Sequence, residues 1–83
     1  MDKDHVQTIV TKLICREAPD LGTDIPPAER FETLGVDSMT VVDIVAAVER
    51  ELEIGIPDEE LGSISTVERL VDLALAHTRT KEQ

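Results

Sequence analysis

Aromatic residues and cysteines are nearly absent from this chain of 83 residues. Phe31 is the only aromatic residue, so a hydrophobic core must be built from aliphatic side chains. Cys15 is the only cysteine, which excludes an internal disulfide, and the sequence offers no cluster of histidines and cysteines for a transition metal. No apolar run approaches the roughly 20 residues that span a bilayer, and the N-terminus lacks the basic-then-apolar order of a signal peptide. We therefore expect one small, soluble, cytoplasmic domain over residues 1–83, without a metal site.

Basic residues are also few, because eight lysines and arginines stand against 18 acids and give a net charge of −10. This balance argues against nucleic acid and membranes as partners. Much of the negative charge lies in residues 37–60, where eight acids accompany a single base, Arg50. Such a segment is either a solvated face that aids solubility or a docking surface for basic patches on other proteins.

The spacing of apolar residues predicts helices throughout, with no stretch that alternates like a strand. A first helix should begin at the capping pair Asp4 and Gln7, run to about Glu17 and stop before Pro19. The loop over residues 18–36 is too long to be a bare connector. We expect it to be pinned to the core, with a helical turn near residues 27–31, by four apolar side chains: Leu21, Ile25, Phe31 and Leu34.

The second half of the chain predicts three more helices. One should run from Ser38 to about Glu53. A short one should follow over residues 59–61, capped by Asp58, and a last one should begin at a capping box of Ser65 and Glu68. The last helix should give way to a frayed tail at about residues 78–83, with His77 exposed to solvent. The fold class is thus all-α: a small antiparallel bundle of three longer helices and one short helix with a long first loop.

Ser38 stands at the start of the most strongly patterned helix. Asp37 can cap that helix, which leaves the serine hydroxyl without a structural task. On a helical wheel, the apolar residues Met39 and Val42 lie near the water-facing side, directly beside it. Both histidines lie near the chain ends, so no base is at hand and we expect no catalytic residue. Ser38 is either an ordinary first-turn serine or a residue that another enzyme modifies.

Three stretches around this serine carry a resemblance to a known family. They are Leu34-Gly35-Val36-Asp37-Ser38-Met39, Ile54-Gly55-Ile56-Pro57-Asp58-Glu59-Glu60 and Ser65-Thr66-Val67. In this order and at this spacing they resemble a free-standing acyl carrier protein, and the resemblance covers nearly the whole chain. It implies that a phosphopantetheinyl transferase attaches 4′-phosphopantetheine from coenzyme A to Ser38. Acyl groups would then travel as thioesters on that arm, and the chain itself would be no enzyme.

The resemblance also implies partners and the residues that meet them. Beyond the transferase, we expect an acyltransferase, a ketosynthase or other acyl-processing enzymes to bind a monomeric chain through basic patches. The residues expected on the docking surface are Asp37, Met39, Thr40, Val42, Asp43, Ala46, Glu49, Arg50, Ile56 and Asp58. The residues expected to line an acyl cavity are Ile44, Val48, Ile64 and Leu70.

Three positions depart from the pattern of carriers in fatty acid synthesis. Thr40 stands where those carriers usually have an acid, Arg50 interrupts the acidic face, and Met39 replaces the common leucine. These departures favour polyketide over fatty acid biosynthesis. Two alternatives stay open: a peptidyl or aminoacyl carrier protein, and a helical protein-interaction module whose serine is never modified.

Overall fold

The computed structural model of this protein describes residues 2–21, 25–26 and 28–82. It consists of four α-helices and one turn of 3-10 helix. They are α1 (Lys3–Glu17), η1 (Pro19–Leu21), α2 (Ser38–Leu52), α3 (Asp58–Leu61) and α4 (Val67–Glu82). Within the described ranges there is no strand, only one isolated bridge between Arg30 and Thr66. The expected all-α fold with three longer helices and one short helix is confirmed.

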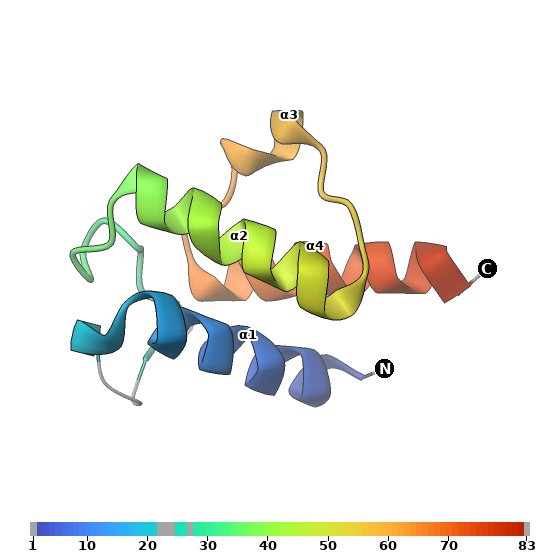
Figure 1. Cartoon of the computed structure of the whole chain (residues 1–83), viewed down its shortest axis with the longest axis horizontal. Coiled ribbons are helices and arrows are strands. Elements are labelled where there is room, and N and C mark those ends of the chain that lie inside the picture. The colour runs from blue at the N-terminus through green and yellow to red at the C-terminus, as the bar shows by residue number, and fades with distance from the viewer. Residues whose placement is uncertain (1, 22–24, 27, 83) are drawn as a thin grey trace.

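The three long helices lie side by side, and α1 packs against both α2 and α4 (Figure 1). α1 runs antiparallel to α2, as expected. α4 runs in the same direction as α2, so the bundle is not antiparallel throughout. The reason is the connection over residues 53–66, which includes α3 and is long enough to return the chain to the end at which α2 begins.

The core between these helices is aliphatic, as the composition requires. Each long helix contributes one buried stripe. In α2 the stripe is Ile44, Val45, Ala47, Val48 and Leu52. Phe31 is 2% exposed and joins the same cluster from the loop before α2. Burying each large apolar side chain stabilises the fold by about 1.5–3 kcal/mol, which is what holds so small a domain together.

The long first loop is pinned to the core much as predicted. Phe31 is buried, and Leu21, Ile25 and Leu34 are half-buried against the core. Pro27, where the expected helical turn was to begin, lies outside the described residues. The turn that is present covers residues 31–35, where the Leu34 amide donates to the Arg30 carbonyl at 3.1 Å. It closes on Gly35, whose φ of +84° favours glycine.

Three of the predicted helix caps are wrong by one or two residues. The cap of α1 is Asp2 rather than Asp4, because Asp2 Oδ1 accepts the amide of His5 at 2.9 Å. α3 begins at Asp58 itself, after Pro57, and has no side-chain cap. At α4 the capping oxygen is Thr66 Oγ1, which accepts the Arg69 amide at 3.0 Å.

The cap of α4 is displaced because the backbone of Ser65 is held elsewhere. The Ser65 carbonyl accepts the amide of Phe31 at 2.8 Å, beside the bridge between Arg30 and Thr66. At its other end α4 continues to Glu82, past the point at which a frayed tail was expected. Thr78 is buried, and its hydroxyl donates to the Leu75 carbonyl at 2.8 Å.

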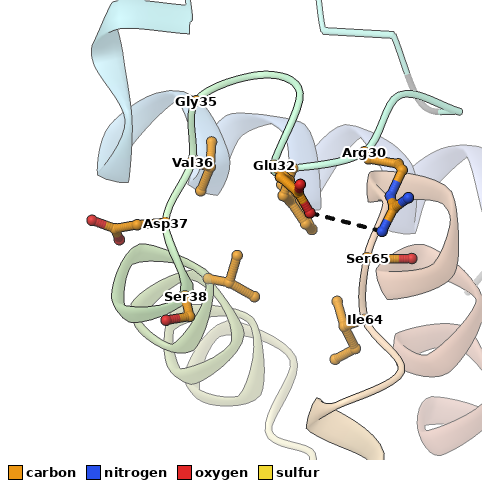
Figure 2. A pocket seen from close by; sticks show the side chains of 10 residues that line it. Arg30, Glu32, Gly35, Val36, Asp37, Ser38, Ile64 and Ser65 are labelled. Carbon is orange, nitrogen blue, oxygen red and sulfur yellow. Dashed lines mark ion pairs between the residues drawn. The ribbon is translucent and has the colours of Figure 1, made fainter.

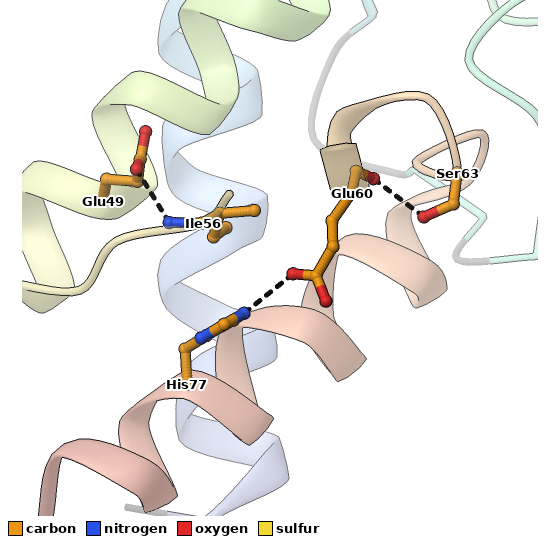
Figure 3. Close-up of polar contacts among 5 residues, drawn as sticks. All are labelled: Glu49, Ile56, Glu60, Ser63 and His77. Atoms are coloured by element: carbon orange, nitrogen blue, oxygen red, sulfur yellow. Dashed lines mark hydrogen bonds and ion pairs between the residues drawn. The ribbon is translucent and has the colours of Figure 1, made fainter. Parts of the chain in front are cut away.

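Side-chain contacts hold the segment between α2 and α4 in place (Figure 3). Glu49 Oε2 accepts the amide of Ile56 at 2.9 Å, which ties the start of the segment to α2. His77 Nε2 lies 2.9 Å from Glu60 Oε2, which ties α3 to α4. The expectation that His77 faces solvent is therefore wrong, because its side chain is only 25% exposed and contacts α3.

Candidate functional site

The site is built around the first residue of α2, Ser38. The chain reaches it through the turn at Gly35 and the buried side chain of Val36. Asp37 is the N-cap, and its Oδ1 accepts the Thr40 amide at 2.8 Å. Ser38 therefore does not cap the helix. Its side chain is exposed, and its hydroxyl forms no hydrogen bond with any other residue that the structure describes.

The cap also fixes the charge next to the serine. The hydrogen bond from the Thr40 backbone, followed by one with the Thr40 side chain, holds the pKa of the Asp37 carboxyl below its usual value of 3.8. The carboxylate is fully exposed and stays ionised at neutral pH. Ser38 thus lies between a fixed negative charge and the positive end of the α2 dipole.

Two grooves open beside Ser38. The first is shown in Figure 2 and has a volume of about 490 Å³. We call it the Arg30 groove. It lies between the loop before α2, the start of α2 and the segment before α4. Its apolar lining comes from Phe31, Val36, Val41 and Ile64, and its polar lining comes from Arg30, Glu32, Asp37, Ser38 and Ser65, beside Gly35.

The second groove, of about 350 Å³, lies on the α3 side of Ser38. We call it the Leu61 groove. It shares Ser38, Val41 and Ile64 with the first and adds Val42, Leu61 and Gly62, so none of its lining residues is charged. The serine hydroxyl is consequently placed where a flexible group attached to it can turn into either groove.

Most residues expected on the docking surface do lie on the surface. Met39 and Val42 are the exposed large apolar residues there, at 70% and 47%. Also exposed are Asp37, Asp43, Ala46, Arg50 and Asp58, whereas Thr40 and Glu49 are half-buried. Ile56 does not belong to this surface. Its side chain is 5% exposed in the core, and its amide is bonded to Glu49, so it cannot offer an apolar contact to a partner.

The four residues expected around an acyl cavity are all buried. Ile44, Val48 and Leu70 are completely covered within the core cluster. Only Ile64, at 6% exposed, lines the two grooves beside Ser38. Besides Ser38, Asp37, Val42 and Ile64, the grooves are lined by residues that the sequence did not single out for a site, Arg30 and Glu32 among them. Nothing in the helical periodicity could have found these two, because their position depends on how the first loop meets the segment before α4.

The described part of the chain offers neither a metal site nor a membrane-spanning helix. It contains no group of three or more His, Cys, Asp or Glu side chains that could hold a metal ion. None of its helices is both long enough and apolar enough to cross a membrane.

Comparison with known proteins points to one kind of site. Residues 5–74 match the family described as a phosphopantetheine attachment site. An acyl carrier protein from Thermotoga maritima has a similar structure, with a TM-score of 0.84 and 26% sequence identity over 98% of this chain and 95% of that one.

Two structures from the actinorhodin polyketide synthase of Streptomyces coelicolor are also similar. Its hexanoyl acyl carrier protein gives a TM-score of 0.75 and 26% identity, covering 86% of this chain and 87% of that one. Its acetyl acyl carrier protein gives 0.74 and 25%, covering 98% and 94%.

Proposed function

Because this chain belongs to the phosphopantetheine attachment site family, we propose that Ser38 is the residue that carries 4′-phosphopantetheine. Members of this family are carriers and not catalysts, and the fold of this chain is that of free-standing acyl carrier proteins. Other enzymes therefore act on what the chain holds.

The observation that carries the proposal is the state of the Ser38 side chain. It is exposed, Asp37 has taken over the capping of α2, and both grooves open at its hydroxyl. The other two serines are less suitable. The hydroxyl of Ser63 donates to the Glu60 carbonyl at 2.8 Å, and Ser65 precedes the cap of α4 with its carbonyl bonded to Phe31.

The site also fits the charge of the group. The first backbone N–H groups of a helix point outward and favour a phosphate placed at that end. On attachment, a bond forms between Ser38 Oγ and the phosphorus that bears the pantetheine arm. The pyrophosphate bond of coenzyme A breaks, adenosine 3′,5′-bisphosphate leaves, and the serine proton passes to a base of the transferase, since no histidine lines either groove beside Ser38.

Once bound, the group supplies a thiol that holds an acyl chain as a thioester. The contribution of this chain is to present that group and to be recognised. Met39 and Val42 offer apolar contacts beside Ser38, and the acids of α2 and α3 attract basic surfaces. Charge of this kind speeds encounter more than it tightens binding, which suits a carrier that must release each partner.

We propose further that the acyl groups belong to polyketide or fatty acid biosynthesis, and we favour polyketide biosynthesis. Two kinds of observation support this preference. Thr40 and Arg50 weaken the acidic pattern of fatty acid carriers, and Met39 replaces their common leucine. Two of the similar structures come from a polyketide synthase. The partners would then be an acyltransferase and a ketosynthase in addition to the transferase.

The test is the intact mass of the protein after incubation with coenzyme A and a phosphopantetheinyl transferase. Wild type should gain the mass of one phosphopantetheine, and Ser38→Ala should gain nothing while keeping its helical circular-dichroism spectrum. Ser63→Ala is the matched control and should be modified like wild type. If wild type stays unmodified with transferases of broad specificity, the carrier proposal is wrong. The remaining interpretation is then a helical interaction module whose serine is never modified.

A further inference from the structure

The two grooves beside Ser38 differ in one chemical respect. Arg30 is the only cationic residue among all those that line them, and it belongs to one groove alone. We propose that the Arg30 groove receives acyl chains with a carbonyl beyond the thioester, that is β-ketoacyl chains, and that Arg30 distinguishes them from saturated chains. This inference rests on the proposed attachment of phosphopantetheine to Ser38.

The backbone of Arg30 is held firmly at the edge of the groove. Its carbonyl accepts the Leu34 amide at 3.1 Å, and it forms the bridge with Thr66. The next residue, Phe31, donates its amide to the Ser65 carbonyl at 2.8 Å. The start of the arginine side chain is therefore fixed by bonds that do not involve the side chain, so a substitution at Arg30 should leave the groove in place.

The guanidinium, in contrast, is loosely held. Its contact within the described part of the chain is with Glu32, where Nη2 and Oε2 are 3.8 Å apart (Figure 2). This distance is too long for a hydrogen bond, and the two side chains are 65% and 85% exposed. A guanidinium has five N–H donors and no acceptor, so Arg30 has donors to offer a carbonyl oxygen in the groove.

The acidic residues of the Arg30 groove decide which oxygen-bearing acyl chains it can accept. Glu32 and Asp37 line the same groove, so its three charged residues sum to −1. A carboxylate on the acyl chain would meet repulsion from both acids, whereas a neutral ketone would not. The apolar side chains of Phe31, Val36, Val41 and Ile64 can cover the carbon atoms of the chain. The groove therefore suits a neutral, carbonyl-bearing chain.

The Leu61 groove provides the contrast within the same molecule. None of its lining residues is charged, so it offers a saturated chain apolar cover but offers a ketone no cationic donor. Because Ser38 lies at both grooves, a single flexible arm can reach either one. Groove choice would then follow from the chemistry of the acyl chain and not from a second attachment point.

The experiment compares two chains of equal length. The protein is loaded by a transferase from coenzyme A, butyryl-coenzyme A or acetoacetyl-coenzyme A, and intact mass confirms each load. Butyryl and acetoacetyl both have four carbons and differ by the ketone oxygen. ¹H–¹⁵N NMR spectra then report the shifts of Phe31, Val36 and the Arg30 side chain, each relative to the protein that carries the arm alone.

We expect acetoacetyl to shift these signals more than butyryl does. In Arg30→Gln the excess at Phe31 and Val36 should fall about three- to tenfold, the size of one hydrogen bond to an exposed charged group. Glu32→Gln, which frees the guanidinium, should increase the excess. Arg16→Gln, on an exposed arginine of α1 outside both grooves, should leave it unchanged.

Several results would overturn the inference. Equal chemical-shift changes from acetoacetyl and butyryl in wild type would show that the groove does not distinguish the ketone. An excess that survives in Arg30→Gln would remove Arg30 from the role, and an excess at Leu61 and Gly62 would place the chain in the other groove. Absence of any mass gain on loading is a different result, because it would remove the proposed function as well.

Discussion

Replacing either His77 or Glu60 by alanine should loosen α3 from the rest of the molecule. α3 is a single turn with no side-chain cap, and Leu61 and Gly62 at its end line the groove on that side of Ser38. The contact between His77 Nε2 and Glu60 Oε2, at 2.9 Å, joins it to α4 across 17 residues of sequence. Loss of this contact should therefore destabilise α3 locally and leave the stability of the long core helices largely unchanged.

The magnitude follows from the exposure of the two side chains. They are 25% and 35% exposed, so the contact is partly shielded but not buried. Pairs on the surface are worth about 0.2–1 kcal/mol, and a short, partly shielded pair should lie near the upper end. A coupling energy of about 1 kcal/mol corresponds to roughly a fivefold change in the equilibrium for local opening.

The assay is amide hydrogen exchange with a double-mutant cycle of Glu60→Ala, His77→Ala and the double variant. Exchange at Ser63 and Ile64, whose amides donate to Glu60 and Leu61, should become about fivefold faster, whereas Val10 in α1 should be unaffected. The matched control is the cycle for Lys3 and Asp72, an exposed pair at 3.7 Å, which should show about 0.3 kcal/mol or less. If the two cycles give the same coupling and α3 exchanges at its wild-type rate, then His77 does not hold α3.

Three further predictions test the core, the cap and the docking surface. Leu70→Ala removes a completely buried side chain and should lower the free energy of unfolding by about 2–5 kcal/mol in urea titrations; a loss below about 1 kcal/mol would contradict the packing described. The pKa of the Asp37 carboxyl, followed by NMR, should lie below 3.8. The contribution of this cap to stability should be complete above pH 3.8 and should be lost as the pH falls through the lower pKa of the folded state. A titration at the usual pKa would mean that the cap is not formed. Met39→Ser with Val42→Ser should change the free energy of unfolding by no more than about 0.5 kcal/mol but weaken recognition by the transferase, measured as a higher KM; an unchanged KM would exclude both side chains from docking.

The sequence predicts the helices well because their apolar spacing is a local property. The buried stripe of α2 and the capping role of Asp37 follow from residues that are neighbours along the chain. The caps of α1 and α3 are misplaced by only one or two residues, and the larger errors arise where distant segments meet. Ser65 is not the cap of α4 because its carbonyl is taken by Phe31, and His77 is not exposed because α3 folds back onto α4.

The same distinction applies to the site. Ser38 could be singled out from the sequence because its surroundings form a local pattern. The cap Asp37 precedes it, its own hydroxyl has no structural role, and the exposed apolar residues Met39 and Val42 follow it. The Arg30 groove could not, because it forms only when the first loop pairs with the segment before α4. Ile56 lies elsewhere than expected for a related reason: the segment after α2 bonds its amide to Glu49 and places its side chain in the core cluster.

The most direct test of the account is to locate the modification within the chain. The protein is treated with coenzyme A and a phosphopantetheinyl transferase, digested, and its peptides are fragmented in a mass spectrometer. We predict that the phosphopantetheine is found on Ser38 and on no other hydroxyl. Its appearance on Ser63, Ser65 or a threonine, or its absence from the whole chain, would contradict the assignment of Ser38 as the attachment residue.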